Sequence, residues 1–249
     1  MAEEAKQTQK SESKDTQTLQ KGDFVEIEFT GKLKDTGEVF DSNRKEDLQK
    51  MPNPDLTKAK PLVYSLGHGM FLQGIDDNLI GQESNKKEHT IELTPENAFG
   101  KRDSNLIKRV PMNVFTEHNL TPVRGGTFNF DGQLGKVLSV SGGRVLVDFN
   151  HPIAGKDVIY DIEVKRKVDD INEQLKAFND IVFRKELKYE LKDEKVVYKK
   201  PQDEQTQKML DMFKPKFKEI FGKELEIKGE ENSSKDNQKN SEESVNQQS

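Results

Sequence analysis

The chain has 249 residues, enough for one or two domains, but 34% of them are charged and only 31% are hydrophobic. A composition this polar excludes one compact body over the whole length and favours tails or thin domains beside the folded part. The absence of cysteine excludes disulfides, thiolate nucleophiles and cysteine-based zinc sites, and a net charge of -5 with interleaved lysines and acids argues against nucleic acid as the main partner.

The two ends of the chain lack the apolar residues that a folded core needs. Apart from Met1, residues 1–20 contain one large apolar residue, and residues 229–249 contain one as well, so we expect both to be disordered tails. No apolar run approaches the roughly 20 residues of a bilayer span, and the first residues lack the apolar stretch of a secretory signal. We therefore expect no membrane partner and a cytoplasmic location.

Short runs of alternating apolar and polar residues begin after Lys21. In FVEIEF, Val25, Ile27 and Phe29 share one face, which is typical of a strand with one buried side. Similar runs recur along the chain, mostly separated by Gly, Pro or Asn, at residues 61–66, 89–93, 127–132, 136–149 and 157–164. The pattern predicts an antiparallel β architecture.

One short helix interrupts these strands, over residues 71–81. Leu72, Ile75 and Leu79 have helical spacing, and Gly81 stands where a C-cap belongs. The four glycines of LGHGMFLQGIDDNLIG also invite a nucleotide-binding interpretation. A dinucleotide fingerprint needs a third glycine where Leu72 stands, and a P-loop needs Lys followed by Ser or Thr, so we expect these glycines to serve a tight turn and a close backbone approach.

After Val168 the pattern changes to helices over residues 170–182 and 202–221 with a hairpin over 186–200, which predicts a small C-terminal α+β domain over 169–228. Its second helix has an apolar face that includes Met209, Met212, Phe213, Phe217, Ile220 and Phe221. Two alternatives stay open for this face. It packs on the hairpin of its own domain, or it serves dimerisation or substrate capture.

Four stretches in order resemble the FKBP-type peptidyl-prolyl cis/trans isomerases. They are KGDFVEIEFTGKLKDTGEVFDSN, KPLVYSLG followed by FLQGIDDNLIG, TPENAFG, and DVIYDIEVKRK. The resemblance implies an α+β fold in which an antiparallel half-barrel wraps a short helix. This isomerase domain would occupy residues 21–102 and 150–168.

The segment between these isomerase stretches resembles a particular subgroup of the family. ENAFGKRD, RVPMNVF and VLVDFNHPIAGK are similar to SlyD-like and archaeal long-type members, in which an inserted β domain replaces the flap. Residues 103–149 would be this insert. The additional domain after Val168 is similar to the archaeal long type.

The resemblance also implies the site residues. Asp41, Phe40, Leu72, Phe99 and Tyr160 would be catalytic, with Phe40, Phe99 and Tyr160 around the proline ring, the Leu72 N–H on the substrate carbonyl, and Asp41 as the one polar side chain. Phe29, Leu62, Phe71 and Ile75 would complete the pocket, with Ile75 as its floor. Many members have Trp where Ile75 stands, and Tyr where Phe29 and Phe99 stand.

The activity implied is rotation of X-Pro bonds in unfolded or proline-containing polypeptides. Because that reaction makes and breaks no covalent bond, no cofactor or metal is expected, and the four histidines are scattered. His151 lies where the resemblance implies a structural junction. In the subgroup the insert binds unfolded polypeptide, and an extended stretch with Val110, Met112, Val114 and Phe115 could line its groove. The alternative function is a holdase that binds proline-containing peptides with little catalysis.

Overall fold

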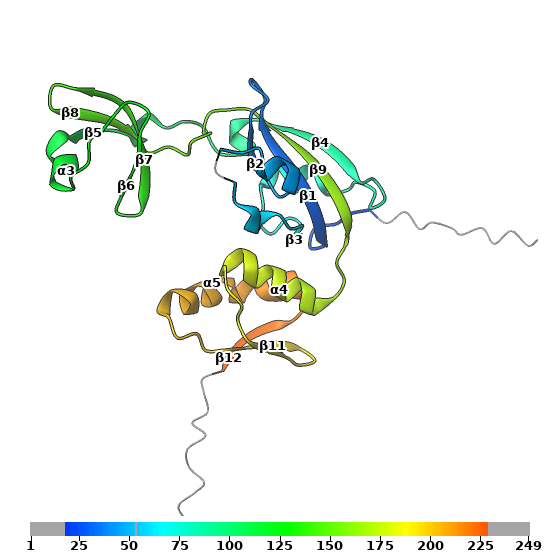
Figure 1. Cartoon of the computed structure of the whole chain (residues 1–249). Helices are drawn as coiled ribbons and strands as arrows, with labels where there is room; N and C mark the ends of the chain where they lie inside the picture. Colours follow the sequence, from blue (N-terminus) through cyan, green and yellow to red (C-terminus); the bar gives the residue numbers. More distant parts are fainter. Residues whose placement is uncertain (1–17, 53, 229–249) are drawn as a thin grey trace, which may run out of the picture.

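The computed structural model describes residues 18–52 and 54–228. These residues form three separate sheets with helices between them, and the predicted α+β class with antiparallel sheets is confirmed (Figure 1). Residues 1–17 and 229–249, which fall in the predicted tails, lie outside the described part. None of the helices in the described part has both the length and the apolar character needed to cross a membrane.

The largest sheet has five strands and is centred on β1. Its strands are β1 (Phe24–Leu33), β2 (Val39–Ser42), β3 (Leu62–Ser65), β4 (Glu88–Leu93) and β9 (Val158–Lys167). One edge of β1 pairs with β9, and the other edge pairs with β2 and β3, always antiparallel. Val25, Ile27 and Phe29 of β1 all face inward and are buried, as their alternation predicts.

Helix α2 (Gln73–Leu79) packs against the inner face of this sheet through the fully buried Ile75 and Leu79. It is shorter than the predicted 71–81, because the flanking Leu72 and Ile80 both keep an extended backbone with ψ of 129°, and Gly81 follows in the left-handed region with φ of 87°. A Cβ on Gly74 would lie 2.6 Å from Leu93 Cδ2 and 2.7 Å from the Asn97 carbonyl oxygen. Gly74 therefore allows the helix to approach its neighbours closely. The smaller elements around it are helix α1 (Lys45–Leu48) and the 3-10 turns η1 (Leu56–Lys58) and η2 (Pro95–Asn97).

Leu19 corrects the predicted N-terminal boundary. Although it falls within the predicted tail of residues 1–20, it is 1% exposed and belongs to the core of the large sheet. Its N–H donates to the Gln82 carbonyl, and its own carbonyl accepts from the Gly81 N–H. A single large apolar side chain beside the first strand was thus enough to extend the ordered part backward.

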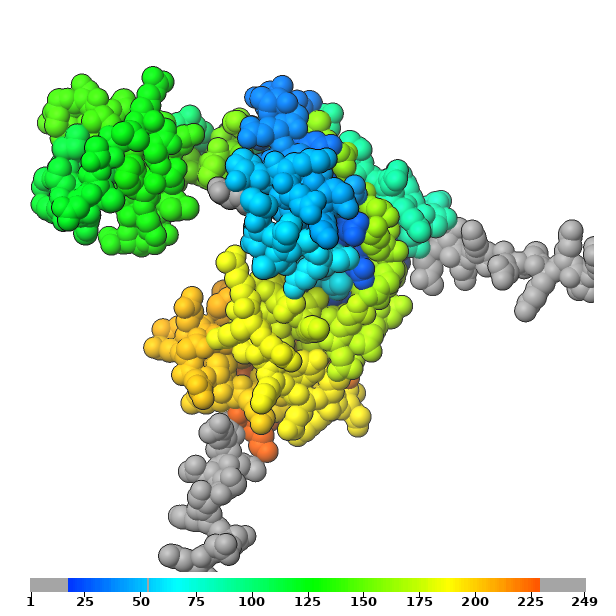
Figure 2. All heavy atoms as spheres, in the orientation of Figure 1, coloured from blue at the N-terminus to red at the C-terminus, as the bar shows by residue number. Residues whose placement is uncertain are grey.

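The insert forms a second body, which stands out as a lobe on a narrow neck (Figure 2). Its elements are the 3-10 turn η3 (Ser104–Leu106), β5 (Ile107–Pro111), α3 (Met112–Glu117), β6 (Thr127–Phe130), β7 (Gln133–Ser141) and β8 (Arg144–Asp148). The four strands form a sheet in the order β5-β8-β7-β6. Phe115, Val137, Val145 and Val147 form a core distinct from that of the large sheet.

The C-terminal part contains α4 (Ile171–Val182), β10 (Tyr189–Leu191), β11 (Lys195–Lys199), α5 (Glu204–Phe221) and β12 (Glu224–Lys228). Both helices and the hairpin lie where the sequence predicts them, whereas β12, which pairs parallel to β11, was not predicted. Most of the apolar face of α5 packs inward, since Phe217, Ile220 and Phe221 are buried, and Met212 remains 65% exposed. The core of this part also includes Phe24 of β1 and Val168.

Candidate functional site

A connected group of aromatic rings lies at the open side of the large sheet. Phe40 meets Phe99 and Tyr160 edge-on, with ring centroids 5.6 and 5.8 Å apart. Phe71 meets Phe29 at 5.1 Å and Tyr160 at 6.0 Å. Tyr160 and Phe29 are buried, whereas Phe40, Phe71 and Phe99 keep part of their surface exposed. The five rings come from four separate stretches of sequence and form one apolar wall.

The remaining pocket residues of the sequence prediction lie in the same core. Leu62 and Leu72 are half-buried against it, and Ile75 beneath them is fully buried. Leu72 precedes α2, and within the described part of the chain its backbone N–H donates to no acceptor. A backbone donor left free beside an apolar wall is suited to holding a carbonyl group of a ligand.

Asp41 contributes the charged group at this wall. It is half-buried, and burial raises the pKa of its carboxyl, opposed by the positive charge of Lys58 and by a hydrogen bond from the Ser42 N–H. Burial raises the pKa of the Tyr160 hydroxyl, and the negative charge of Asp41 raises it further. The Asp41 carboxyl and the Tyr160 hydroxyl are therefore coupled electrostatically.

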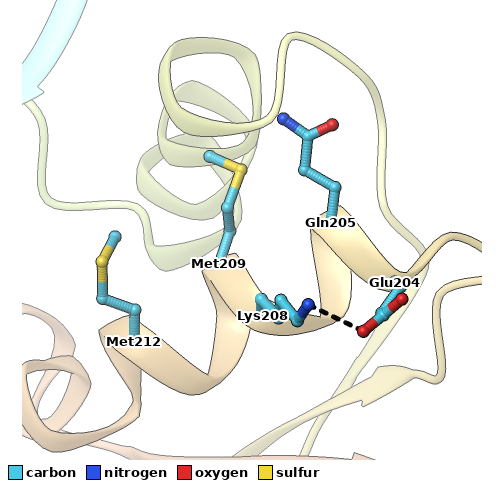
Figure 3. A pocket seen from close by; sticks show the side chains of 5 residues that line it. All are labelled: Glu204, Gln205, Lys208, Met209 and Met212. Atoms are coloured by element: carbon cyan, nitrogen blue, oxygen red, sulfur yellow. Dashed lines mark ion pairs between the residues drawn. The ribbon is translucent and has the colours of Figure 1, made fainter.

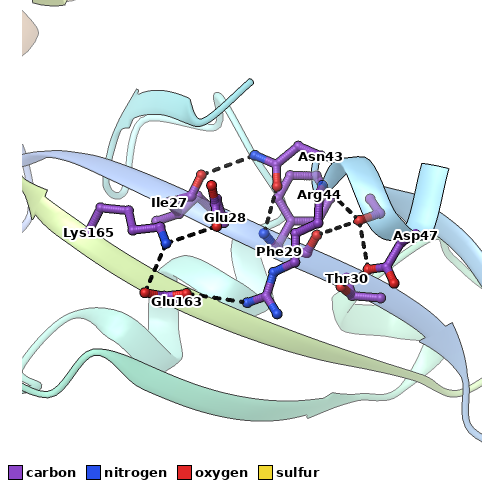
Figure 4. Close-up of polar contacts among 10 residues, drawn as sticks. Ile27, Glu28, Phe29, Thr30, Asn43, Arg44, Asp47, Glu163 and Lys165 are labelled. Carbon is purple, nitrogen blue, oxygen red and sulfur yellow. Dashed lines mark hydrogen bonds and ion pairs between the residues drawn. The ribbon is translucent and has the colours of Figure 1, made fainter. Parts of the chain in front are cut away.

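Asn43 fixes the segment that carries Phe40 and Asp41. On the outer edge of β1, pairing with β2 begins at Thr30 and pairing with β3 ends at Ile27. The Asn43 side chain fills the gap, since its Oδ1 accepts from the Phe29 N–H at 2.7 Å and its Nδ2 donates to the Ile27 carbonyl at 3.0 Å (Figure 4). An amide side chain thus replaces the missing strand partner and ends β2 directly beyond Asp41.

The sequence motifs did not single out Asn43, nor did they single out Gly31. A Cβ at Gly31 would lie 3.0 Å from both the Phe40 and the Tyr160 ring. A larger residue there would displace the two rings that define the wall. The only sequence signal is a glycine inside a strand, which often marks a close approach of this kind.

Asp76 lies buried under the loop that leads to Leu72. It is 2% exposed, and its Oδ2 accepts from the Gly67 N–H at 3.0 Å. Within the described part of the chain, its Oδ1 and the nearby Tyr64 hydroxyl have no hydrogen-bond partner. Burial raises the pKa of Asp76 to about 6.

We expect Asp76 to make stability depend on pH. Because folding raises this pKa from 3.8 to about 6, the folded chain holds more protons than the unfolded chain between those values, so stability falls as the pH rises through that interval and is constant above it. D76N should remove this dependence. The free energy of unfolding of D76N minus that of wild type should therefore increase by about 2 kcal/mol from pH 4.5 to pH 7.5.

Chemical denaturation at these two pH values measures the effect, with D35N, at an exposed position between β1 and β2, as the control. The same difference between D76N and wild type at both pH values would contradict the assignment. In wild type, the Gly67 amide resonance should titrate with a midpoint near pH 6.

The insert residues of the sequence prediction are only partly accessible. The predicted extended conformation is wrong for Met112, Val114 and Phe115, because these residues lie on helix α3. Phe115 is 1% exposed because the helix turns its ring into the insert core against Phe128 and Phe130. Val110, Met112 and Val114 are half-buried. The accessible apolar residues of the insert are ones that the sequence did not indicate, namely Leu120, Val123, Leu134 and Val140.

The histidines hold no common site. Among the described residues, no group of three or more His, Cys, Asp or Glu side chains is placed to hold a metal ion. The His151 ring stacks on Phe99, with centroids 4.8 Å apart and planes 11° apart. It therefore lies at the junction of the insert and the aromatic wall.

Comparison with known proteins agrees with this geometry. A family model described as FKBP26, IF domain, matches residues 108–153, the region of the insert. The short-type peptidyl-prolyl cis-trans isomerase of Methanocaldococcus jannaschii is 30% identical over 149 residues, which cover 59% of this chain and 92% of that protein. The FKBP-type 16 kDa peptidyl-prolyl cis-trans isomerase of Escherichia coli K12 is 30% identical over 154 residues, covering 60% of this chain and 93% of its own.

A SlyD isomerase of Treponema pallidum is 30% identical over 159 residues, covering 61% of this chain and 80% of that protein. Among solved structures, a wheat chain with three FKBP domains matches 62% of this chain and 42% of the wheat chain, with 18% identity and a TM-score of 0.32. This similarity is too low to add to the assignment. The assignment rests on the three sequence relatives, because this chain covers most of their length. The chain belongs to the FKBP-type family of peptidyl-prolyl cis-trans isomerases and is an enzyme of that class.

Proposed function

We propose that the chain acts in the cytoplasm on proline-containing polypeptides, and that their X-Pro bonds rotate against the aromatic wall. The observation that carries this proposal is the Leu72 N–H, which has no acceptor among the described residues and lies beside the rings of Phe40, Phe99 and Tyr160. The proline ring would pack on the rings, and the Leu72 N–H would hold a substrate carbonyl. Ile75, Phe29, Phe71 and Leu62 would close the apolar surround.

The chemistry needs little more than such a surface. Rotation of an X-Pro bond crosses a barrier of about 18–20 kcal/mol, because resonance in the planar amide separates charge. Water supports that charge separation and an apolar pocket does not, so the pocket favours the twisted form. A thousandfold acceleration requires only about 4 kcal/mol.

We further propose that the insert binds unfolded polypeptide and presents it to the wall. Its four exposed apolar residues support this, because Leu134 is 63% and Val123 is 58% exposed on a lobe with only a small core of its own. The separate cores also support a modular division into an isomerase domain (21–102 and 150–168), an insert (103–149) and a C-terminal domain (169–228).

Two substrates test these proposals. A short proline-containing peptide reports on the wall alone, whereas prolyl-limited refolding of a protein also engages the insert. Substitutions at the wall should slow both reactions, and changes confined to the insert should slow only the second.

We also propose that the C-terminal domain carries the surface for a second copy of the chain. Met209, Met212 and three polar residues of α5 line a shallow hollow of about 390 Å³ (Figure 3). Its rim carries the Glu204–Lys208 ion pair at 2.7 Å. In a two-fold contact, Glu204 of one copy could meet Lys208 of the other while the methionines pack together, as self-complementary interfaces require.

We expect light scattering to show a concentration-dependent dimer that M212K prevents, because the substitution places a charge in the apolar centre of the contact. L191K, at a residue of β10 that is 37% exposed, is the control and should leave the dimer unchanged. Equal masses for wild type and M212K at all concentrations would favour the alternative, in which α5 packs only within its own domain.

A further inference from the structure

The loop that supplies Phe71 and Leu72 to the aromatic wall also contacts the C-terminal domain. We refer to residues 66–72, between β3 and α2, as the pocket loop. Met70 packs against both the core of the large sheet and the core of the C-terminal domain. Phe24, where β1 begins, meets Phe221 of α5 with ring centroids 5.4 Å apart. The C-terminal domain thus lies directly behind the pocket loop.

His68 is the polar contact of the loop on this side. Its side chain is only 3% exposed. Its Nδ1 lies 2.8 Å from the Ser65 hydroxyl, and its Nε2 lies 3.5 Å from Glu219 Oε1 of α5. Burial lowers the pKa of His68, while the negative charge of Glu219 acts in the opposite direction and Lys21 and Lys216 add to the lowering. Within the described part of the chain, His68 Nε2 makes no hydrogen bond, so its approach to Glu219 is a charge contact, whereas Nδ1 is within hydrogen-bond distance of the Ser65 hydroxyl.

Glu219 connects a second segment to the same point. Its Oε1 also lies 2.9 Å from the Lys21 ammonium, just before β1. The Lys21 side chain runs along the loop, because a Cβ at Gly67 would lie 2.7 Å from Lys21 Cγ. One carboxylate of α5 therefore contacts the start of β1 and the pocket loop together.

The loop needs such contacts because its own backbone is permissive. Gly67 and Gly69 have φ of 76° and 70°, and nothing lies within 4 Å of where a Cβ of Gly69 would be. On one side the Gly67 N–H is held by Asp76. Between Gly67 and Leu72, the His68 side chain is buried against α5, and the partly buried Met70 packs against both the core of the C-terminal domain and the core of the large sheet.

We propose that the C-terminal domain supports the pocket loop, with Glu219 and His68 as positioning residues that set the place of the Leu72 N–H. This inference rests on the proposed pocket, in which that N–H holds the substrate carbonyl. Displacing such a group by about 1 Å is enough to slow a reaction severely. The C-terminal domain would then contribute to isomerisation without touching the substrate.

The test compares two glutamates of the full-length protein. E219A removes the contact with the loop, whereas E226A removes a glutamate of β12 that pairs with Lys195 at 3.0 Å within the C-terminal domain. We expect E219A to lower kcat/KM for a proline-containing tetrapeptide roughly 3- to 10-fold and to shift the amide resonances of Gly69, Met70 and Phe71. E226A should change neither. E219Q, which keeps the size of the side chain and a polar oxygen beside His68 but not the charge, should recover part of the loss.

H68A provides a second route, because it removes the contact from the loop side and leaves α5 intact, and the same loss is expected. A folded E219A with unmoved loop resonances and kcat/KM within about twofold of wild type would overturn the inference. D41A, measured in the same series, distinguishes a failure of the proposed pocket from a failure of the loop support. If D41A loses activity and E219A does not, the pocket stands and the loop support falls. Unchanged activity in D41A would remove the pocket, and with it the role given to the loop.

Discussion

D41A and F99A are each expected to lower kcat/KM for an X-Pro tetrapeptide by at least about tenfold, which corresponds to about 1.4 kcal/mol of transition-state stabilisation. Phe99 is half-buried. Phe40 meets its ring edge-on, and the His151 ring stacks on it. Its removal opens the wall to water. Asp41 is the half-buried carboxyl facing Tyr160, and in a site of low dielectric its charge acts strongly on the dipole of the rotating carbonyl.

Two matched variants control for general damage. D35A removes an exposed carboxylate from the same β1–β2 connection, and F128A removes a half-buried ring from the insert. Neither should change tetrapeptide isomerisation by more than about twofold. Tetrapeptide rates as fast as wild type in both D41A and F99A would remove the assigned wall.

The same peptide distinguishes the enzyme pocket from a holdase pocket at these residues. NMR titration of the wild type should show the tetrapeptide bound, with cis and trans signals exchanging faster than without protein. Binding without faster exchange would mean that the wall holds prolines and that catalysis depends on another surface. The comparison is informative because the resemblance to the family implies larger or hydroxylated residues at the positions where Ile75, Phe29 and Phe99 stand.

The residues of the aromatic wall were implied by the resemblance to the FKBP-type isomerases, whose motifs are short and continuous in this sequence. Phe40 and Asp41 lie within the short strand β2, and Phe99 follows a Pro-initiated turn. Leu72 directly precedes a helix whose apolar spacing is visible in the sequence. The alternation along β1 gave the inward face correctly. Local rules of this kind fix a residue's place when one strand or turn determines it.

The predictions that failed depend on contacts between distant residues. Leu19 stands in a polar segment, and only its fit against the core of the large sheet explains its burial. The sequence predicts an extended stretch for Met112, Val114 and Phe115, but these residues form helix α3, which places Phe115 in the insert core. The His68–Glu219 contact joins residues 151 positions apart in sequence, and no local pattern announces it.

Excision of the insert is expected to separate peptide catalysis from protein folding. The two ends of the insert lie together, since the Gly155 N–H donates to the Gly100 carbonyl at 2.9 Å. Asp103 and Asn150 also pair, with the Asp103 N–H donating to Asn150 Oδ1 at 2.8 Å and Asn150 Nδ2 donating to the Asp103 carbonyl at 2.9 Å. A few glycines can therefore replace residues 103–149 while His151 remains stacked on Phe99.

In the excised protein, tetrapeptide kcat/KM should stay within about threefold of wild type, because the insert core shares no residue with the core behind the wall. Acceleration of prolyl-limited refolding should fall roughly 100-fold, because the wall alone must then capture the client without a tethered binding site that raises its local concentration.

Point variants give the same contrast without removing chain. Replacing Val123 and Leu134 by Ser should reduce refolding acceleration and leave the tetrapeptide rate unchanged, whereas L56S, at a residue 50% exposed outside the insert, should alter neither. Undiminished refolding acceleration after excision would mean that the client binds elsewhere. Parallel loss of both activities would mean that the insert shapes the wall itself, through His151 and Phe99, rather than holding the client.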